Sequence, residues 1–342
     1  MKYFSLFICL SIYGISTAQQ IKIAFGSCSH QDKPLGILKQ IAKSKPDYFI
    51  FLGDNIYGDT EDMNVLQQKY EKLGKDKNFK ALKKSTTLLA TWDDHDFGVN
   101  DGGKNYPKKE ESKQLFLDFF DEPKDSPRRS RPGIYSVQMI ETKYGVIQII
   151  LLDTRTFRDE LRVADSTFQQ DTIFKYHLDY APILTPDSTL LGENQWKWLE
   201  AQLRNKADLR IIATSTQFGI SFNGYESWAN FPFERERMIE TIRKTRARGV
   251  VFISGDVHYG ELSKLFTPTT YPLYDLTASG LTQSWDFATP NSKRIAGPVM
   301  DNHYGQLIID MKTKTLTFQI IDKFKRVRID YSLPWTKLDF TP

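Results

Sequence analysis

The fold is decided by the stretch Phe51-Leu52-Gly53-Asp54-Asn55-Ile56-Tyr57-Gly58-Asp59. An apolar run over residues 48–52 predicts a buried strand, so Asp54 lies just past a strand's C-terminal end, where open α/β sheets bind their ligands. A carboxylate at this point could bridge two cations, with the phenol of Tyr57 turned toward one of them. The alternative is an Asx turn in which Asp54 and Asn55 satisfy loop amides.

The segment before this stretch predicts a β-α-β unit. Residues 21–25 predict a strand that ends at Gly26-Ser27-Cys28-Ser29-His30, and residues 34–44 have helical spacing. Because parallel strands direct their C-terminal ends to the same edge of a sheet, Cys28 and Asp54 are expected side by side.

Later strands also end in polar loops. Strands expected at 87–91, 145–152, 209–214 and 250–253 lead into Trp92-Asp93-Asp94-His95-Asp96, Asp153-Thr154-Arg155, Ser215-Thr216-Gln217 and Ser254-Gly255-Asp256-Val257-His258. Helices are expected at 61–85, 108–120, 192–205 and 234–248, and residues 159–190 predict a long surface excursion. From residue 261 onward, short alternating strands indicate antiparallel sheet. The predicted fold class is α/β, with two packed mixed β-sheets flanked by helices in one domain over residues 19–342.

The composition is that of a folded protein. Of 342 residues, 40% are hydrophobic and 26% charged, which argues against disorder. The net charge of +4 is small, whereas a nucleic-acid binder more often carries a concentrated basic stripe. We therefore expect no specific nucleic-acid partner, and a monomer.

Residues 1–18 have the pattern of a secretory signal peptide. Lys2 precedes an apolar run over residues 3–15, and Ser16-Thr17-Ala18 supplies small residues for cleavage. The run is too short to span a bilayer, which needs about 20 residues. A secreted or periplasmic location is expected. Cleavage would leave Cys28 as the single cysteine, so its thiol would be buried, reactive or bound to a metal.

Seven side chains with donor atoms follow these predicted strands: Cys28, Asp54, Tyr57, Asp94, His95, Asp256 and His258. Such a set predicts a metal-bound active site. Thiolate and phenolate suit a trivalent or soft transition metal better than magnesium, although iron, manganese, zinc and calcium share these donors. Two cations that share Asp54 could hold both oxygens of a phosphoryl displacement and lower the pKa of a bound water to give the attacking hydroxide. Phosphate-ester hydrolysis is therefore predicted, with small-molecule, lipid or polymer phosphate esters as substrates.

At these residues the sequence resembles a known family. The motifs that carry the likeness are Phe25-Gly26-Ser27-Cys28, Gly53-Asp54-Asn55-Ile56-Tyr57, Trp92-Asp93-Asp94-His95-Asp96, Leu152-Asp153-Thr154-Arg155-Thr156-Phe157-Arg158, Ser215-Thr216-Gln217 and Ser254-Gly255-Asp256-Val257-His258. In this order they resemble the alkaline phosphatase D (PhoD-like) branch of the calcineurin-type metallophosphoesterases. The stretch 227–235 is similar to that family's Trp…Pro…Arg segment beside the substrate, which marks Trp228 as a substrate contact.

The resemblance implies an αββα sandwich that hydrolyses phosphate monoesters and diesters at a centre of Fe³⁺ and Ca²⁺, with zinc or manganese as alternatives. By this likeness Cys28, Tyr57 and His258 would hold the ferric ion and Asp54 would bridge. Asp94 and Asp256 would face calcium, and His95 would contact the phosphate or protonate the leaving group.

Several roles stay open at this stage. Asp93 could replace Asp94 as ligand if the loop is offset by one residue. Gln217 stands where the wider superfamily has a metal-binding His, and an amide is acceptable to calcium; it is also a candidate substrate contact. Arg155 could clamp a phosphate or pair with Asp153 to fix the loop. The rival functions are a phospholipase-type phosphodiesterase and a non-catalytic phosphate- or metal-binding surface protein.

Overall fold

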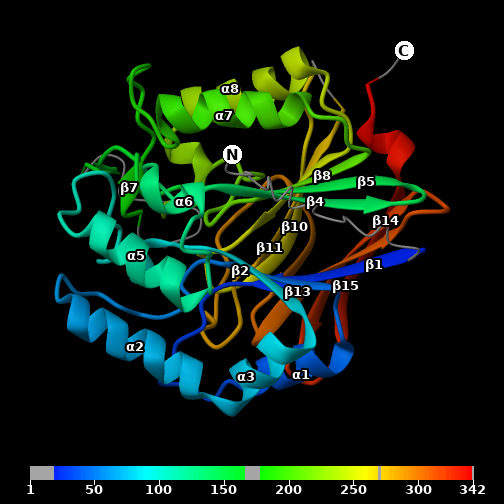
Figure 1. Ribbon diagram of the computed structural model, residues 1–342. Helices are drawn as coiled ribbons and strands as arrows, with labels where there is room; N and C mark the ends of the chain where they lie inside the picture. Colours follow the sequence, from blue (N-terminus) through cyan, green and yellow to red (C-terminus); the bar gives the residue numbers. More distant parts are fainter. Residues whose placement is uncertain (1–18, 166–177, 269–270, 341–342) are drawn as a thin grey trace, which may run out of the picture.

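The structure is a computed structural model that describes residues 19–165, 178–268 and 271–340, so the expected signal peptide lies outside the described residues. Two mixed β-sheets pack against each other, and helices flank them on both sides (Figure 1). The expected fold class is therefore confirmed. No helix in the described ranges has the length and apolar character needed to cross a membrane.

The first sheet contains the two strands that the β-α-β pattern predicts. Its order is β15 (Val327–Pro334), β14 (Thr315–Asp322), β13 (His303–Asp310), β1 (Gln20–Gly26), β2 (Tyr48–Leu52) and β3 (Thr87–Thr91). Strands β1, β2 and β3 are parallel, whereas β13 joins β1 antiparallel. The C-terminal ends of β1, β2 and β3 therefore lie at one edge of the sheet.

The second sheet contains a further set of parallel strands. Its order is β12 (Arg294–Val299), β10 (Gly260–Leu265), β11 (Leu273–Ala278), β9 (Val250–Ser254), β8 (Leu209–Ala213), β5 (Gly145–Leu151) and β4 (Ser136–Thr142). Strands β5, β8, β9 and β11 are parallel neighbours. A two-stranded ribbon, β6 (Arg162–Val163) with β7 (Tyr180–Ala181), stands apart from both sheets.

The helices cover the outer faces. Helices α1 (Gly36–Ser44), α2 (Met63–Lys75) and α3 (Lys77–Ser85) lie on the side of the first sheet, and α7 (Gly192–Arg204) and α8 (Pro232–Thr245) lie on the side of the second (Figure 1). The remaining helical segments are α4 (Asp94–Phe97), α5 (Lys109–Phe119), α6 (Pro127–Ser130), η1 (Trp228–Asn230) and η2 (Trp335–Leu338).

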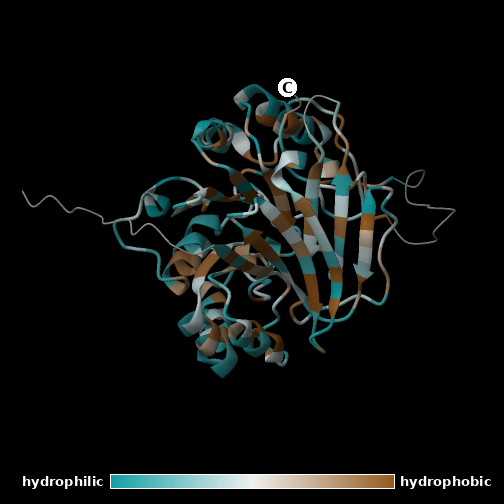
Figure 2. Ribbon diagram, turned by 90° about the vertical axis from the view of Figure 1, so that its right-hand side faces the viewer, coloured by the Kyte–Doolittle hydropathy of each residue, from teal (hydrophilic) through white to brown (hydrophobic). Residues whose placement is uncertain are grey.

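Strand β2 shows why this sequence forms layers. Ile50 and Leu52 belong to the apolar cluster that also contains inward residues of both sheets. Phe49 and Phe51 point to the opposite face and pack with residues of α1, α2 and α3. Because side chains alternate along a strand, one short apolar run can serve both layers. Hydrophobic colouring accordingly runs along the central strands, and hydrophilic colouring is prominent on the outer helices (Figure 2).

Two elements differ from expectation. The helix expected over 61–85 is two helices, because Asp76 leaves helical geometry and its side chain accepts hydrogen bonds from the amides of Asn78 and Phe79, which caps α3. Strand β12 was not expected, since it contains Gly297 and Pro298, residue types that are depleted in strands. It lies at a sheet edge, where proline is tolerated.

We expect Phe252→Ala to lower the free energy of unfolding by about 3–5 kcal/mol, because truncating a buried aromatic ring leaves a cavity. Phe252 lies on β9 with 0% exposure, and its ring stacks on Phe218 at 3.8 Å between centroids. Phe266 is 70% exposed, so the matched change Phe266→Ala should stay within about 0.5 kcal/mol. Urea unfolding followed by circular dichroism measures both; equal losses would contradict the layer assignment.

Candidate metal centre

Turns after β1, β2 and β9 bring four of the expected donors together. The Cys28 Sγ lies 3.5 Å from Asp54 Oδ2, and the Tyr57 hydroxyl lies 3.4 Å from the same oxygen. The Tyr57 hydroxyl is also 3.2 Å from Nε2 of His258. Ligand atoms of Cys28, Asp54 and His258 all lie within 4.8 Å of one another, a spacing at which one cation could contact all three.

A second group of donors shares Asp54 with the first. Ligand atoms of Asp54, Asp94 and His95 also lie within 4.8 Å of one another. Oδ1 of Asp54 is buried and, within the described part of the chain, has no hydrogen-bond partner. A buried carboxylate oxygen without a partner is costly, and a cation would remove that cost. Asp54 therefore has the geometry of a bridging ligand between two sites.

Four donor residues have left-handed backbone conformations, with positive φ angles at Cys28 (62°), Asp54 (50°), Asp256 (78°) and His258 (49°). Non-glycine residues adopt this region at a cost of order 1–3 kcal/mol each, and such residues cluster at functional sites. In each case the chain turns sharply just after a strand. The strain is thus concentrated where the side chains must face one another.

The loop after β3 fixes the loop after β2. Oδ1 of Asp96 accepts hydrogen bonds from the backbone N–H groups of Asp93 (2.6 Å) and Asp54 (3.2 Å), and Oδ2 accepts from the N–H of Asn55 at 3.3 Å. The Asn55 side chain donates to the carbonyl of Thr91 at 2.9 Å. Asp96 is therefore a positioning residue for Asp54.

The structure turns Asp93 and Asp94 in different directions. Asp94 lines the same cavity as Asp54 and His95. Asp93 instead accepts a hydrogen bond from the Ser215 hydroxyl at 2.7 Å and forms an ion pair with Arg155. This arrangement brings Asp94, and not Asp93, to the donor groups.

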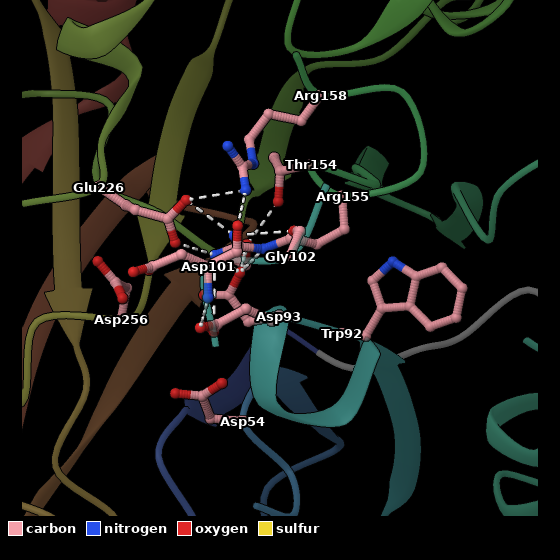
Figure 3. A network of polar contacts seen from close by, with 12 residues as sticks. Asp54, Trp92, Asp93, Asp101, Gly102, Thr154, Arg155, Arg158, Glu226 and Asp256 are labelled. Atoms are coloured by element: carbon pink, nitrogen blue, oxygen red, sulfur yellow. Dashed lines mark hydrogen bonds and ion pairs between the residues drawn. The ribbon is translucent and has the colours of Figure 1, made fainter. Parts of the chain in front are cut away.

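Arg155 lies beneath the cavity rather than in it. Its side chain has 0% exposure, and it donates to both carboxylate oxygens of Glu226 at 2.8 and 2.6 Å while it also contacts Asp93 (Figure 3). Its donors are thus engaged by buried acids, and it does not line the cavity. Arg155 therefore offers no donor to a phosphate in the cavity, contrary to expectation. The loop-fixing alternative fits better, with Asp93 and Glu226 as the paired acids in place of Asp153.

Two further expectations do not match the geometry. Gln217 is fully buried, and its amide donates to Glu261 at 3.0 Å and to Thr277 at 3.1 Å. Trp228 is also fully buried, with its indole N–H donating to Thr214 at 2.9 Å. Neither residue lines the cavity. Both belong to the packing of the second sheet, because the loop after β8 turns into the protein rather than toward the donors.

The cavity beside the donors has a volume of about 230 Å³. Its lining includes residues that the sequence analysis does not assign to the site: Asn100, Asp101, Asp179, Tyr180, Tyr225, Glu226 and Trp285. Asp101 and Glu226 form a third acidic group with Asp94, again with ligand atoms within 4.8 Å. The Tyr180 hydroxyl donates to Asp101, so the β6–β7 ribbon also contacts this wall.

Crowding of acids in a buried space shifts their pKa values upward. Burial, followed by repulsion from Asp94 and Asp93, raises the pKa of Asp54 well above its usual value. Burial and repulsion from neighbouring acids likewise raise the pKa of Asp256. Burial also raises the pKa values of the Cys28 thiol and the Tyr57 phenol. All four groups would ionise more readily with a multivalent cation among them, and thiolate, phenolate, imidazole and carboxylate together fit a transition metal with a harder second cation.

The two histidines have opposite environments. Burial lowers the pKa of His258 to about 4, which leaves a neutral imidazole suited to binding a metal. Burial acts in the same direction on His95, but its hydrogen bond with Asp59 and the nearby Asp94 outweigh it and raise its pKa to about 9. Nδ1 of His95 lies 2.7 Å from Asp59 Oδ1. The contact with Asp59 thus favours the protonated form of His95 and occupies one of its two ring nitrogens.

Comparisons with known proteins find relatives of this chain. A family model described as PhoD-like phosphatase matches residues 23–332. Alkaline phosphatase D of Bacillus subtilis (strain 168) is 26% identical over 284 residues, which are 72% of this chain and 47% of that protein. The chain thus spans about half the length of this curated relative.

Solved structures share the fold. The structure of PhoD has a TM-score of 0.74 at 18% identity, over 95% of this chain and 72% of that one. GAP50, the anchor in the inner membrane complex of Plasmodium, has a TM-score of 0.58 at 14% identity, over 94% of this chain and 90% of its own. A dimetal phosphatase from Danio rerio has a TM-score of 0.58 at 11% identity, over 94% of this chain and 99% of its own.

We expect Arg155→Met to lower the free energy of unfolding by about 3–5 kcal/mol, because it leaves Asp93 and Glu226 buried without a cation. Arg204 pairs with Glu200 at 2.6 Å on the surface, so Arg204→Met should cost less than about 1 kcal/mol. Urea unfolding measures both. A stable Arg155→Met variant with a raised KM for phosphate esters would instead restore the substrate-binding role of Arg155.

Proposed function

The chain belongs to the PhoD-like phosphatase family, and from this premise we propose that it is a metal-dependent phosphohydrolase that cleaves phosphate monoesters and diesters. The observation that carries the proposal is the pair of donor groups that share Asp54 beside a cavity of about 230 Å³. The fold alone would not suffice, since GAP50, which has the same fold, is named for a role as an anchor.

The proposed cofactors are Fe³⁺ and Ca²⁺. Cys28, Tyr57 and His258 would hold the ferric ion, Asp94 and Asp256 would face calcium, and Asp54 would bridge. When bound, such a pair of cations neutralises phosphate oxygens and lowers the pKa of a water that serves as nucleophile. The acid-rich wall explains why cations are needed at all, because a phosphate group would otherwise be repelled by the carboxylates.

His95 is proposed as the group that serves the leaving alcohol. Asp59 holds Nδ1, so Nε2 is the ring nitrogen that remains for the substrate. A protonated imidazole at this position can donate a hydrogen bond to a phosphate oxygen, or a proton to the departing alkoxide. Asp59 was not expected from the sequence, although it belongs to the stretch that decides the fold.

Export with removal of residues 1–18, a monomeric state and a secreted or periplasmic location also remain proposals. Assays with p-nitrophenyl phosphate, bis(p-nitrophenyl) phosphate and a phospholipid would separate a monoesterase, a diesterase and a phospholipase. Turnover of none of the three would favour the non-catalytic alternative.

We expect Asp54→Asn to reduce turnover of p-nitrophenyl phosphate and bis(p-nitrophenyl) phosphate by at least about 100-fold. Loss of a residue that only hydrogen-bonds to a metal ligand already costs about 10–100-fold in activity or metal affinity, and Asp54 would itself be a ligand. The fold should remain, since the amide fills the same space. Asp187 is exposed, so Asp187→Asn is the matched control and should leave turnover unchanged. Undiminished hydrolysis by the folded Asp54→Asn protein would refute the bridging role of Asp54.

We expect the purified protein to contain iron and calcium and to show a visible charge-transfer band from the Tyr57 phenolate. Tyr57→Phe should remove that band while calcium is retained, because the phenolate would be an iron ligand only. Elemental analysis and absorption spectroscopy measure both. A colourless protein with zinc would refute the ferric assignment and leave the phosphohydrolase proposal standing.

A further inference from the structure

Three aromatic rings form a row at the edge of the acidic cavity, and we call Tyr225, Trp285 and Phe287 the aromatic ladder. The ring centroids of Tyr225 and Trp285 are 5.1 Å apart. Trp285 and Phe287 stack at 5.0 Å with an angle of 5° between the ring planes. Trp285 also lies 5.1 Å from the ring of His258, so the ladder begins directly beside the metal donors.

Trp285 separates two hollows. On one side it lines the acidic cavity with Asp54 and His95. On the other side it lines a groove of about 380 Å³, whose walls include Pro298 and Met300. A substrate whose phosphate lies among the donors would therefore direct its alcohol part past Trp285 and into the groove.

The side chains of the aromatic ladder are too exposed to serve only in packing the core. Trp285 and Tyr225 are half-buried, Phe287 is 39% exposed and Met300 is 38% exposed. Aromatic and thioether side chains that serve packing are normally buried, whereas a solvent-facing group of them beside a cavity marks a binding surface. The ladder is also held in position, because the backbone N–H of Trp285 donates to the carbonyl of His258 at 3.1 Å.

Charge in the groove disfavours a second anionic group. Arg328 is the cation in the groove's lining, and it contacts Asp301 at 2.7 Å and Asp322 at 3.2 Å. Asp286 adds another carboxylate to the same lining. A leaving group that is itself a phosphate would find no unpaired cation in this lining, while an uncharged ring would find apolar and aromatic contacts.

We propose that the aromatic ladder binds the leaving group, and that the preferred substrates are phosphate esters whose alcohol carries a planar aromatic or heteroaromatic ring. This inference rests on the proposed phosphohydrolase function. Flat rings stack on aromatic side chains largely irrespective of their substituents. The ladder therefore selects a class of ester rather than one compound.

Adenosine 5′-monophosphate and ribose 5-phosphate test the proposal, because both release the same kind of primary alcohol and differ in the base. We expect wild-type kcat/KM to favour the nucleotide by about tenfold, within the range that stacking of one base provides. Trp285→Leu should reduce this ratio toward one, and Trp285→Phe should retain most of it. Phe266 is 70% exposed and lines neither the acidic cavity nor the groove, so Phe266→Leu is the matched control.

The outcomes separate the two proposals. Equal losses on both substrates in Trp285→Leu would show that the ring only supports His258, and would overturn the inference. Calorimetric titration of the metal-loaded protein with adenosine and with ribose gives a second readout that needs no turnover. Adenosine binding that depends on Trp285 would support the aromatic ladder even if no ester is cleaved. Failure to cleave any ester would refute only the proposed function. Absence of adenosine binding, together with a kcat/KM ratio near one, would refute the inference.

Discussion

The buried acids around Asp54 must be balanced by positive charge, and the arrangement of the site follows from this constraint. Arg155 supplies one part of the balance, since it is fully buried between Asp93 and Glu226. In the described part of the chain, Asp54 and Asp256 form no salt bridge. A buried carboxylate without a partner is costly, so such a group takes up either a proton or a cation. The protein thus neutralises one side of the cluster itself and leaves the other side for cations.

The fold meets this constraint by converging strand ends. Parallel neighbours in both sheets place the turns after β1, β2 and β9 together, so residues separated by over two hundred positions reach bonding distance of one another. Left-handed backbone at Cys28, Asp54, Asp256 and His258 completes the approach. The apolar layers on either side of β2 supply the stability that holds such strained turns in place.

The sequence was sufficient for the parallel strands that lead to the site and for the donor side chains that directly follow them, because periodicity is local and parallel strands share an edge. It was not sufficient for side-chain direction. Arg155, Gln217 and Trp228 also follow or adjoin strand ends, yet they turn into the protein and bond to buried acids, a threonine and an amide network. Glu226 and Trp285 could not be found, since neither follows a strand and their partners are distant in sequence.

The strand ends determine the positions of the metal donors, whereas the loops determine the walls of the cavity and the groove. Donors close to strand ends have little freedom, because the strand determines where the chain turns. The groove beyond Trp285 is built mainly from loop residues, with Pro298 of β12 and Arg328 of β15 completing its lining. Loop residues vary with little cost to the core. Trp285 nevertheless bonds through its backbone to His258, a proposed metal ligand. A change that moves the backbone of this loop would therefore reach His258 through the same hydrogen bond, whereas a change of the Trp285 side chain alone leaves that bond in place.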